Sequence, residues 1–340
     1  MKNLNLTARR LLLLGAAFTL AAVTGPASAE DKTAIVVYNA QHEALGQAWA
    51  DGFSKQTGIA VTIRNGGDTE FANQLVQEGG NSPADVFLTE NSPAMSLVDS
   101  KGLFAPVDTT TLALLPDAFK AADGKWIGVA ARSTVFAYDK TKLQQADLPK
   151  SLLDLADPKW KGRWAASPTG ADFQAIVSAF LELKGEKETK AWLEALKENA
   201  TFYKGNSVAM KAVNVGQVEG AVIYHYYWFG DQAKTGENSK NVALHYFKNQ
   251  DPGAFVSVSG GGVLASNKHQ KEAQAFLQYV VGKDGQAILR DGSSYEYAVG
   301  LGDASNAKLV PLADLQAPKV EASKLNSEKV TELMTEAGIL

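Results

Sequence analysis

Apolar and polar positions alternate in blocks along the first hundred residues after residue 30. Three short apolar runs, at residues 34–38, 59–63 and 84–90, have the length and composition of buried strands. The two stretches between them, residues 43–58 and 68–80, place apolar side chains three or four positions apart and predict helices. Strands and helices that alternate with short connections predict a parallel sheet covered by helices.

The ends of these two helices are also marked in the sequence. Leu45, Trp49 and Phe53 lie four apart on one face of the first helix, and Gly58 is placed to end it. Asp68 is placed to act as the N-cap of the second helix. Both helices therefore have defined starts or stops and one apolar face to turn toward the sheet.

The rest of the chain continues in this style, without an internal repeat or a low-complexity linker. Four more strands are predicted, at residues 134–139, 164–167, 219–224 and 261–265. Six more helices are predicted, at residues 172–185, 187–200, 206–217, 271–282, 284–292 and 327–340. A length of about 310 residues beyond the N-terminal segment favours two domains. We therefore expect an α/β protein of two lobes, each a mostly parallel sheet flanked by helices, with strands that cross between the lobes beside a cleft.

The first 29 residues have the pattern of a signal peptide. A basic start that includes Arg9 and Arg10 precedes an apolar run at residues 11–24, which is too short to span a bilayer comfortably. Residues 27–29 read Ala-Ser-Ala, a small-x-small cleavage site. We expect export, cleavage after about Ala29, and a periplasmic location in a bacterium.

Composition and motifs remove several classes of function. The chain has no cysteine, which excludes disulfides, thiolate metal sites and cysteine nucleophiles. Its 33 basic and 37 acidic residues form no basic stripe, which argues against a nucleic-acid partner. The G-x-S-x-G and H-E-x-x-H motifs of hydrolases do not occur, so an exported enzyme is not expected.

Four polar side chains follow predicted strands at their carboxyl ends, where open parallel sheets bind ligands. His42 follows the first strand, Glu90 ends the third, and Tyr226 and Tyr227 follow the strand at residues 219–224. The two tyrosines can also be core aromatics, because adjacent residues on a regular strand point to opposite faces. Both reach one ligand only if the backbone turns at the end of the strand.

These four side chains form a donor set for a hard trivalent cation. A phenol with a pKa of about 10 is a poor ligand at pH 7, and only a strongly charged ion displaces its proton. Two phenolates and one carboxylate supply three negative charges that balance Fe³⁺, and histidine adds a neutral fourth ligand. Two octahedral positions are left for a small oxyanion or water. The pattern predicts Fe³⁺, with Fe²⁺ and Mn²⁺ as alternatives.

An anion in those two positions would need donors of its own. The candidates offer hydroxyl, amide, guanidinium or backbone N–H groups, and they are Arg132, Thr169, Gly170, Ala171 and Asn206. Residues 169–171 precede a predicted helix, whose N-terminus favours an anion. Asp172 opposes this hypothesis, because its carboxylate would compete for the same N–H groups.

Seven segments, in order along the chain, resemble the periplasmic ferric-binding proteins of iron(III) ABC transporters. They read VVYNAQHEA, SPADVFLTENSPA, ARSTVFAYD, DPKWKGR, NSVAMKAV, HYYW and DPGAFVSVSGGGVL. The resemblance implies the type II periplasmic binding protein fold, with expected lobes at residues 30–131 with 258–306 and at residues 132–257 with 307–340. It also implies a monomer that performs no catalysis, closes by a hinge and delivers Fe³⁺ to an inner-membrane ABC permease.

The resemblance assigns roles to individual residues. It implies that His42, Glu90, Tyr226 and Tyr227 are the metal ligands, with Tyr224 as an alternative ligand. It places a synergistic anion at residues 169–171 and Asn206, with Arg132 near the metal.

Two questions about the ligand stay open from the sequence. The chain departs from the phosphate-binding members before the tyrosine pair, where Tyr224 and His225 stand in place of asparagines. Carbonate and phosphate therefore both stay open as the anion. The alternative function is a solute-binding protein for an organic ligand, such as a polyamine or a sugar, held by aromatic side chains.

Overall fold

The computed structural model describes residues 34–340, and the predicted signal peptide at residues 1–29 lies outside them. The strands are β1 (Ala34–Asn39), β2 (Ala60–Asn65), β3 (Val86–Leu88), β4 (Trp126–Asp139), β5 (Trp164–Ala166), β6 (Ala200–Phe202), β7 (Gly220–Tyr224), β8 (Val242–His245) and β9 (Val256–Val263). The α-helices are α1 (Glu43–Thr57), α2 (Asp68–Glu78), α3 (Ser92–Ser100), α4 (Thr109–Leu112), α5 (Ala171–Asn199), α6 (Asn206–Asn214), α7 (Tyr226–Lys234), α8 (Gln270–Val281), α9 (Lys283–Asp291) and α10 (Ser327–Glu336).

The strands form one mixed sheet in the order β2-β1-β3-β9-β4-β7-β5-β6, and β8 also pairs with β4. The outer pairings are parallel, as predicted: β1 pairs with β2 and β3, and β5 pairs with β6 and β7. The central pairings are antiparallel and join β9 to β3 and β4, and β4 to β7 and β8. The sheet therefore has two halves, each with a parallel group of strands at its outer end, and antiparallel strands connect them.

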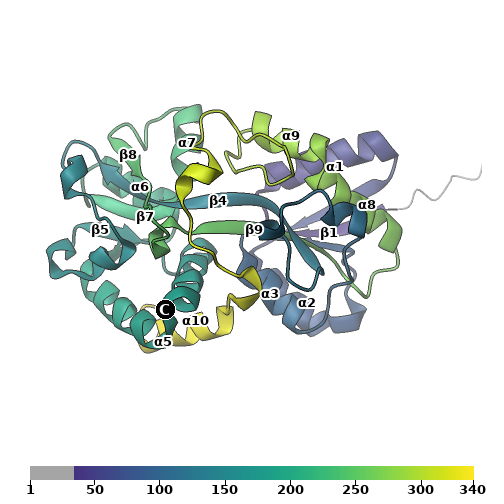
Figure 1. The fold of residues 1–340 in the computed structure, drawn as a ribbon, viewed down its shortest axis with the longest axis horizontal. Helices are drawn as coiled ribbons and strands as arrows, with labels where there is room; N and C mark the ends of the chain where they lie inside the picture. Colours follow the sequence, from purple (N-terminus) through teal and green to yellow (C-terminus); the bar gives the residue numbers. More distant parts are fainter. Residues whose placement is uncertain (1–33) are drawn as a thin grey trace, which may run out of the picture. The chain divides into compact units, whose positions relative to one another are not determined.

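Strand β4 connects the two halves because it takes part in both. Its first part, from Trp126 to Ser133, pairs with β9, and its second part, from Thr134 to Asp139, pairs with β7 and β8. Figure 1 shows β4 and β9 running side by side through the middle of the sheet. Arg132 lies inside β4, whereas the sequence placed it just before a strand that begins at residue 134.

The helix boundaries confirm one predicted cap and correct another. Gly58 ends α1 in the left-handed conformation, with φ of 77°. Asp68 is not the N-cap of α2, because Gly67 holds that position and Asp68 is the first helical residue. The carboxylate of Asp68 instead accepts hydrogen bonds from the backbone N–H of Glu90 at 2.9 Å and from Nδ2 of Asn91 at 3.1 Å.

Several elements were not predicted, and they are α3, α4, α7, β6 and β8. Helix α7 begins with four aromatic residues, 226–229, which lack the polar positions of an amphipathic helix. The helices predicted at residues 172–185 and 187–200 form the single element α5, with a break at Gly185, where φ is 79° and ψ is 170°.

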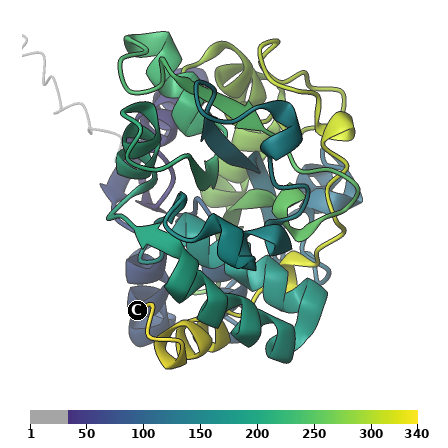
Figure 2. The same cartoon turned by 90° about the vertical axis from the view of Figure 1, so that its left-hand side faces the viewer.

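Helices cover both halves of the sheet. Apolar side chains of α2 and α3 pack against β1 and β3, and those of α6 pack against β4 and β7. The C-terminal helix α10 packs against α5, and both views show the yellow helix beside the teal one (Figures 1 and 2). Of the helices at residues 34–340, none combines the length and the apolar character that crossing a bilayer requires.

The contact between β7 and β4 leaves no room for a side chain at Gly220. A Cβ atom there would lie 2.0 Å from Cζ of Phe136, whose ring packs against Trp160 at a centroid distance of 5.5 Å. We predict that Gly220→Ala lowers the free energy of unfolding by about 1–3 kcal/mol, because the buried ring must move. Urea denaturation of the purified variant measures this loss.

Gly230 in α7 provides the matched control. A Cβ atom at Gly230 would meet no heavy atom within 4 Å. Gly230→Ala should therefore raise the free energy of unfolding by about 0.5–1 kcal/mol, since alanine loses less entropy than glycine in a helix. Equal effects of the two substitutions would contradict the packing explanation.

Candidate metal centre

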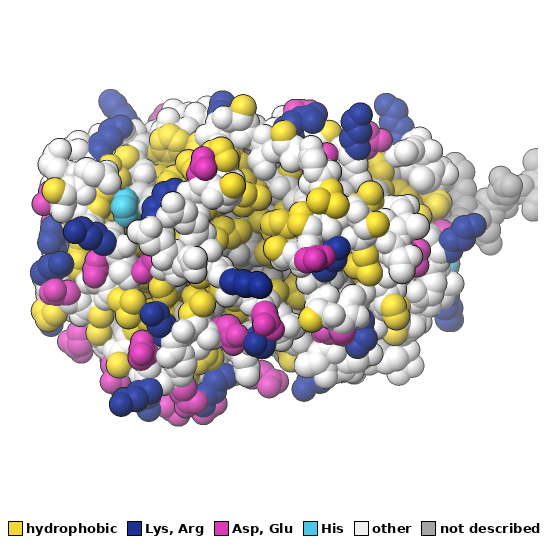
Figure 3. Space-filling model, viewed as in Figure 1, with side chains coloured by type: hydrophobic (Ala, Val, Ile, Leu, Met, Phe, Trp, Pro, Cys, Tyr) yellow, Lys and Arg dark blue, Asp and Glu magenta, His cyan; other side chains and the backbone are white. Residues whose placement is uncertain are grey.

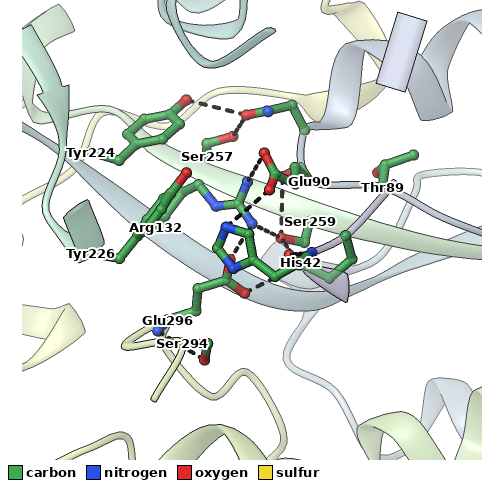
Figure 4. Close-up of polar contacts among 12 residues, drawn as sticks. His42, Thr89, Glu90, Arg132, Tyr224, Tyr226, Ser257, Ser259, Ser294 and Glu296 are labelled. Atoms are coloured by element: carbon green, nitrogen blue, oxygen red, sulfur yellow. Dashed lines mark hydrogen bonds and ion pairs between the residues drawn. The ribbon is translucent and has the colours of Figure 1, made fainter. Parts of the chain in front are cut away.

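The predicted ligand residues come from strand ends and helix starts in both halves of the sheet. His42 follows β1 and precedes α1, and Glu90 follows β3. Tyr226 and Tyr227 are the first two residues of α7, and a single residue separates this helix from β7. Arg132 comes from β4, between the two groups. The sheet therefore brings the predicted side chains to one region of the molecule, where Figure 4 shows His42, Glu90, Arg132 and Tyr226.

The hydroxyl groups of the two tyrosines converge. Tyr226 donates to Oδ2 of Asp172 at 3.1 Å, and Tyr227 donates to the same oxygen at 2.9 Å. Their rings stack with centroids 4.3 Å apart. The chain enters α7 directly after β7, and this turn lets adjacent residues point in the same direction.

His42 and Glu90 form the second part of the centre. Nε2 of His42 lies 2.9 Å from Oε1 of Glu90, and Nδ1 of His42 lies 3.4 Å from Oε1 of Glu296. The imidazole is thus placed between two carboxylates. Nη2 of Arg132 donates to Oε1 of Glu296 at 2.5 Å, and Nη1 of Arg132 lies 3.8 Å from Oε2 of Glu90.

Aromatic contacts join the two parts. The ring of His42 lies 4.9 Å from the ring of Tyr226, and the guanidinium carbon of Arg132 lies 5.5 Å from the centroid of the same ring. Among residues 34–340, no group of three or more His, Asp or Glu side chains is arranged to hold a metal ion by itself. A metal ion in this region would therefore depend on the tyrosine hydroxyls.

Asp172, which the sequence analysis treated only as a competitor of the predicted anion, is the acid that contacts both tyrosine hydroxyls. It lies in the first turn of α5, is 5% exposed, and binds both tyrosine hydroxyls through Oδ2. Asn206 donates to Oδ2 at 2.8 Å, and Asn91 donates to Oδ1 at 3.0 Å. The sequence showed an acid at the predicted anion loop, but it gave no sign that this acid faces the tyrosine pair.

Most of the predicted anion donors have partners within the protein. The backbone N–H of Gly170 donates to the carbonyl oxygen of Ser167 at 3.0 Å, and the amide of Asn206 donates to Asp172. Nη2 of Arg132 donates to Glu296 and to Oγ of Ser259. Thr169 is exposed, and Ala171 is the first residue of α5. Three of the five predicted donors, Gly170, Asn206 and Arg132, therefore already donate to groups of the protein itself.

Tyr224 and His225 lie beside the cluster formed by His42, Glu90, Asp172, Tyr226 and Tyr227. The Tyr224 hydroxyl lies 3.4 Å from Oδ1 of Asn91 and 3.3 Å from the carbonyl oxygen of Asp172. Nδ1 of His225 accepts from the backbone N–H of Ser133 at 3.1 Å. Burial lowers the pKa of His225 to about 3, so this imidazole is neutral at pH 7.

The electrostatics of the cluster are set by burial and by neighbouring carboxylates. Burial, and then the charge of Asp172, raises the pKa of Tyr226 and of Tyr227 above the usual range of phenols. Burial, and then the charge of Glu90, likewise raises the pKa of Asp172. Burial would raise the pKa of Glu90 too, but the hydrogen bond to His42 and the charge of Arg132 outweigh it and lower that pKa.

An open cleft of about 780 Å³ leads to the cluster. His42, Tyr226 and Tyr227 lie on its wall, together with Lys211 and Lys234. On the face seen in Figure 3, basic and acidic side chains are interspersed. This face therefore shows no continuous stripe of basic side chains.

Comparisons with known proteins identify the protein family to which this chain belongs. Residues 81–324 match the family described as bacterial extracellular solute-binding protein. The chain is 67% identical over 328 residues to the Fe(3+)-binding periplasmic protein of Serratia marcescens, and the match covers 96% of each chain. It is 37% identical over 336 residues to the major ferric iron-binding protein of Neisseria meningitidis serogroup B, covering 98% of this chain and 99% of the other.

A solved structure shows the same fold. The iron-bound HitA of Pseudomonas aeruginosa matches with a TM-score of 0.85 and 42% identity, over 90% of this chain and 99% of that chain. The predicted type II periplasmic binding protein fold is therefore confirmed. The chain belongs to the bacterial extracellular solute-binding proteins, in the group that includes these ferric iron-binding relatives.

Proposed function

We propose that the chain is an exported, monomeric binding protein of the periplasm that captures Fe³⁺ and delivers it to an inner-membrane ABC permease. The observation that carries the proposal is the convergence of the Tyr226 and Tyr227 hydroxyls beside His42 and Glu90. The names of relatives that match nearly the whole chain support the choice of iron as the ligand. The proposed role is binding and delivery, without chemical conversion of the ligand.

The proposed ligands are His42, Glu90, Tyr226 and Tyr227. The two phenols are neutral in the metal-free protein because their pKa values are raised. A trivalent ion displaces these protons and gains two phenolates as ligands. The hydroxyl of Tyr224 is directed to Asn91 and the backbone of Asp172, so we propose that it supports the site from outside the ligand set.

Asp172 is proposed as a further ligand in place of the predicted synergistic anion. Its Oδ2 already touches both tyrosine hydroxyls, so an ion bound to those two oxygens would lie next to it. A carbonate or phosphate would have to compete with this carboxylate for the amide of Asn206. A built-in carboxylate supplies the same negative oxygen without a second molecule.

We also propose that binding closes two lobes around the ion. The proposed lobes are those expected from the sequence, residues 30–131 with 258–306 and residues 132–257 with 307–340. His42 and Glu90 belong to one lobe, and Tyr226, Tyr227 and Asp172 belong to the other. An ion held by all five would therefore favour the closed state, which is the state that a permease can recognise.

Removal of either phenol should abolish the colour of the iron-loaded protein or weaken it strongly. We predict that Tyr226→Phe and Tyr227→Phe each lower the affinity for iron by more than about 100-fold, because loss of an outer partner alone costs 10–100-fold. The measurement is the visible phenolate-to-iron absorption during titration with ferric citrate.

Tyr279→Phe is the matched control for this experiment. Tyr279 lies in α8 and lines a different pocket, so its replacement should leave both colour and affinity unchanged. A wild-type protein that stays colourless would contradict the iron proposal. It would favour an organic ligand, which gives no such band.

The affinity for iron should fall as the pH falls. Both phenols carry protons in the metal-free protein and lose them on binding, so lower pH opposes binding. The two protons released from the phenols alone predict a change of at least about 100-fold per pH unit between pH 6 and 8, and a proton displaced from the buried Asp172 would add to it. Competition with citrate at each pH measures the slope.

The pH dependence of iron affinity in the Tyr227→Phe variant distinguishes protons released by the phenols from the pH dependence of citrate itself. This variant has one phenol fewer, so its affinity should change by about tenfold less per pH unit than that of the wild type. Identical slopes would show that Tyr227 is not deprotonated on binding.

The anion can be tested in buffer freed of carbonate and phosphate. We predict that the wild-type protein forms the coloured iron complex there, because Asp172 supplies the carboxylate. Asp172→Asn should need added carbonate or phosphate, since the amide provides no negative oxygen. A wild-type protein that binds iron only after carbonate or phosphate is added would restore the synergistic anion as a required component.

A further inference from the structure

Glu296 is a fully buried carboxylate that the sequence analysis did not select. It follows α9 and is 0% exposed. The next residue, Tyr297, is tied to Ala131 of β4 by two backbone hydrogen bonds, of 2.8 Å from the Tyr297 N–H and 3.1 Å from the Ala131 N–H. This bridge fixes Glu296 next to Arg132, which follows Ala131 in β4.

The backbone just before Glu296 is in an unusual conformation. Tyr295 has φ of 55°, in the left-handed region that bulky residues rarely adopt. Its ring is 6% exposed and stacks on Phe229 of α7 at a centroid distance of 5.7 Å. Such conformations persist only where the surroundings enforce them, and they cluster at functional sites.

The contacts of Glu296 are with groups that surround the proposed metal site. Oε1 accepts from Nη2 of Arg132 at 2.5 Å and lies 3.4 Å from Nδ1 of His42. Oε2 accepts from Nε2 of Gln41 at 3.2 Å. Gln41 also accepts the backbone N–H of His42 through Oε1 at 2.7 Å. Figure 4 shows Glu296 beneath the imidazole of His42 and close to Arg132.

The position of the imidazole decides which of its nitrogens can bind a metal. Nε2 of His42 faces Glu90 at 2.9 Å, and Nδ1 faces Glu296. A neutral imidazole has one N–H donor and one lone pair. In the metal-free protein Nε2–H donates to Glu90, and a metal ion must displace that proton. If Nδ1 then keeps its proton facing Glu296, the lone pair of Nε2 is free for the ion. Metal-binding histidines almost always donate their other N–H to such a partner.

We propose that Glu296 is a positioning residue of the metal site, which holds His42 with Nδ1 protonated and Nε2 turned toward Glu90 and Tyr226. This inference rests on the proposed function and adds a residue outside the ligand set. Glu296 acts through His42, and its bond to Arg132 fixes the position of its carboxyl group.

A simpler role for Glu296 would be to neutralise Arg132 alone. Arg132 is fully buried, and its Nη2 donates to both Glu296 and Ser259. Loss of that ion pair would lower stability, but its effect on iron binding would not depend on His42. The dependence on His42 therefore distinguishes the two roles.

A double-mutant cycle tests the proposal. We predict that Glu296→Gln weakens iron binding by about 10–100-fold in the wild-type background. In the His42→Ala background, the same substitution should change the affinity by less than about threefold, because the group that it positions is gone. The measurement is competition with citrate, followed by the visible iron band. An equal loss in both backgrounds would overturn the proposal.

Glu219→Gln is the matched control, because it breaks an Arg–Glu pair away from the cluster. Nη2 of Arg163 donates to Oε2 of Glu219 at 2.6 Å, and neither residue contacts the proposed ligands. This variant should bind iron as the wild type does. If Glu219→Gln lowered the affinity for iron as much as Glu296→Gln does, the effect would come from removing any negative charge and not from the position of Glu296.

A second measurement needs no variant of Glu296 and so does not depend on its folding. In protein labelled with ¹⁵N at histidine and loaded with diamagnetic Ga³⁺, we expect His42 to show a proton on Nδ1 and a coordinated Nε2. His42→Gln assigns the signal among the four histidines. If the wild type forms the iron band but Nδ1 carries no proton, only the role of Glu296 fails. If no iron band forms, the proposed function itself fails.

Discussion

More carboxyl groups than cationic groups are gathered around Arg132, and the rest of the site depends on this imbalance. Glu90, Asp172 and Glu296 surround a single guanidinium, that of Arg132, and one imidazole. An isolated buried carboxylate is so costly that it takes up a proton instead. Burial accordingly raises the pKa values of Asp172 and Glu296, and it raises that of nearby Asp68 to about 8. A highly charged cation relieves this cost, because it stabilises the ionised forms together.

The fold creates the imbalance by bringing acids from distant segments to one place. The carboxyl ends of β1 and β3 carry His42 and Glu90, while the start of α5 and the start of α7 carry Asp172 and the tyrosine pair. Strand β4 passes between these groups as one continuous strand, with Arg132 near its middle. The side chain of Asn91 links the two sides, because Nδ2 donates to Asp68 at 3.1 Å and to Asp172 at 3.0 Å. The acids are therefore held close by hydrogen bonds that a purely apolar cleft would lack.

Sequence patterns predicted the parts of the site that depend on local position. His42, Glu90 and Tyr226 were expected to lie close together because each stands at the end of a recognisable strand, and strand ends meet at one edge of a sheet. The structure brings these three side chains together. Helix α7 was missed because consecutive aromatic residues do not show helical periodicity. Glu296 lies in an irregular segment, and its place beside Arg132 results from a bridge between residues 131 and 297. Asp172 was seen as an acid at a helix start, but the direction of its carboxylate is set by tertiary contacts.

The protonated phenols explain why such a site would prefer a trivalent ion. Removing a proton costs about 1.36 kcal/mol for each unit by which the pKa exceeds the pH. Two ordinary phenols at pH 7 therefore cost about 8 kcal/mol, and burial of Tyr226 and Tyr227 adds to this cost. A divalent ion is attracted less strongly by the same two phenolates but must displace the same protons. Reduction of bound Fe³⁺ to Fe²⁺ would lower the attraction and leave the proton cost unchanged. The phenols would then take up protons again, and the ion would be released.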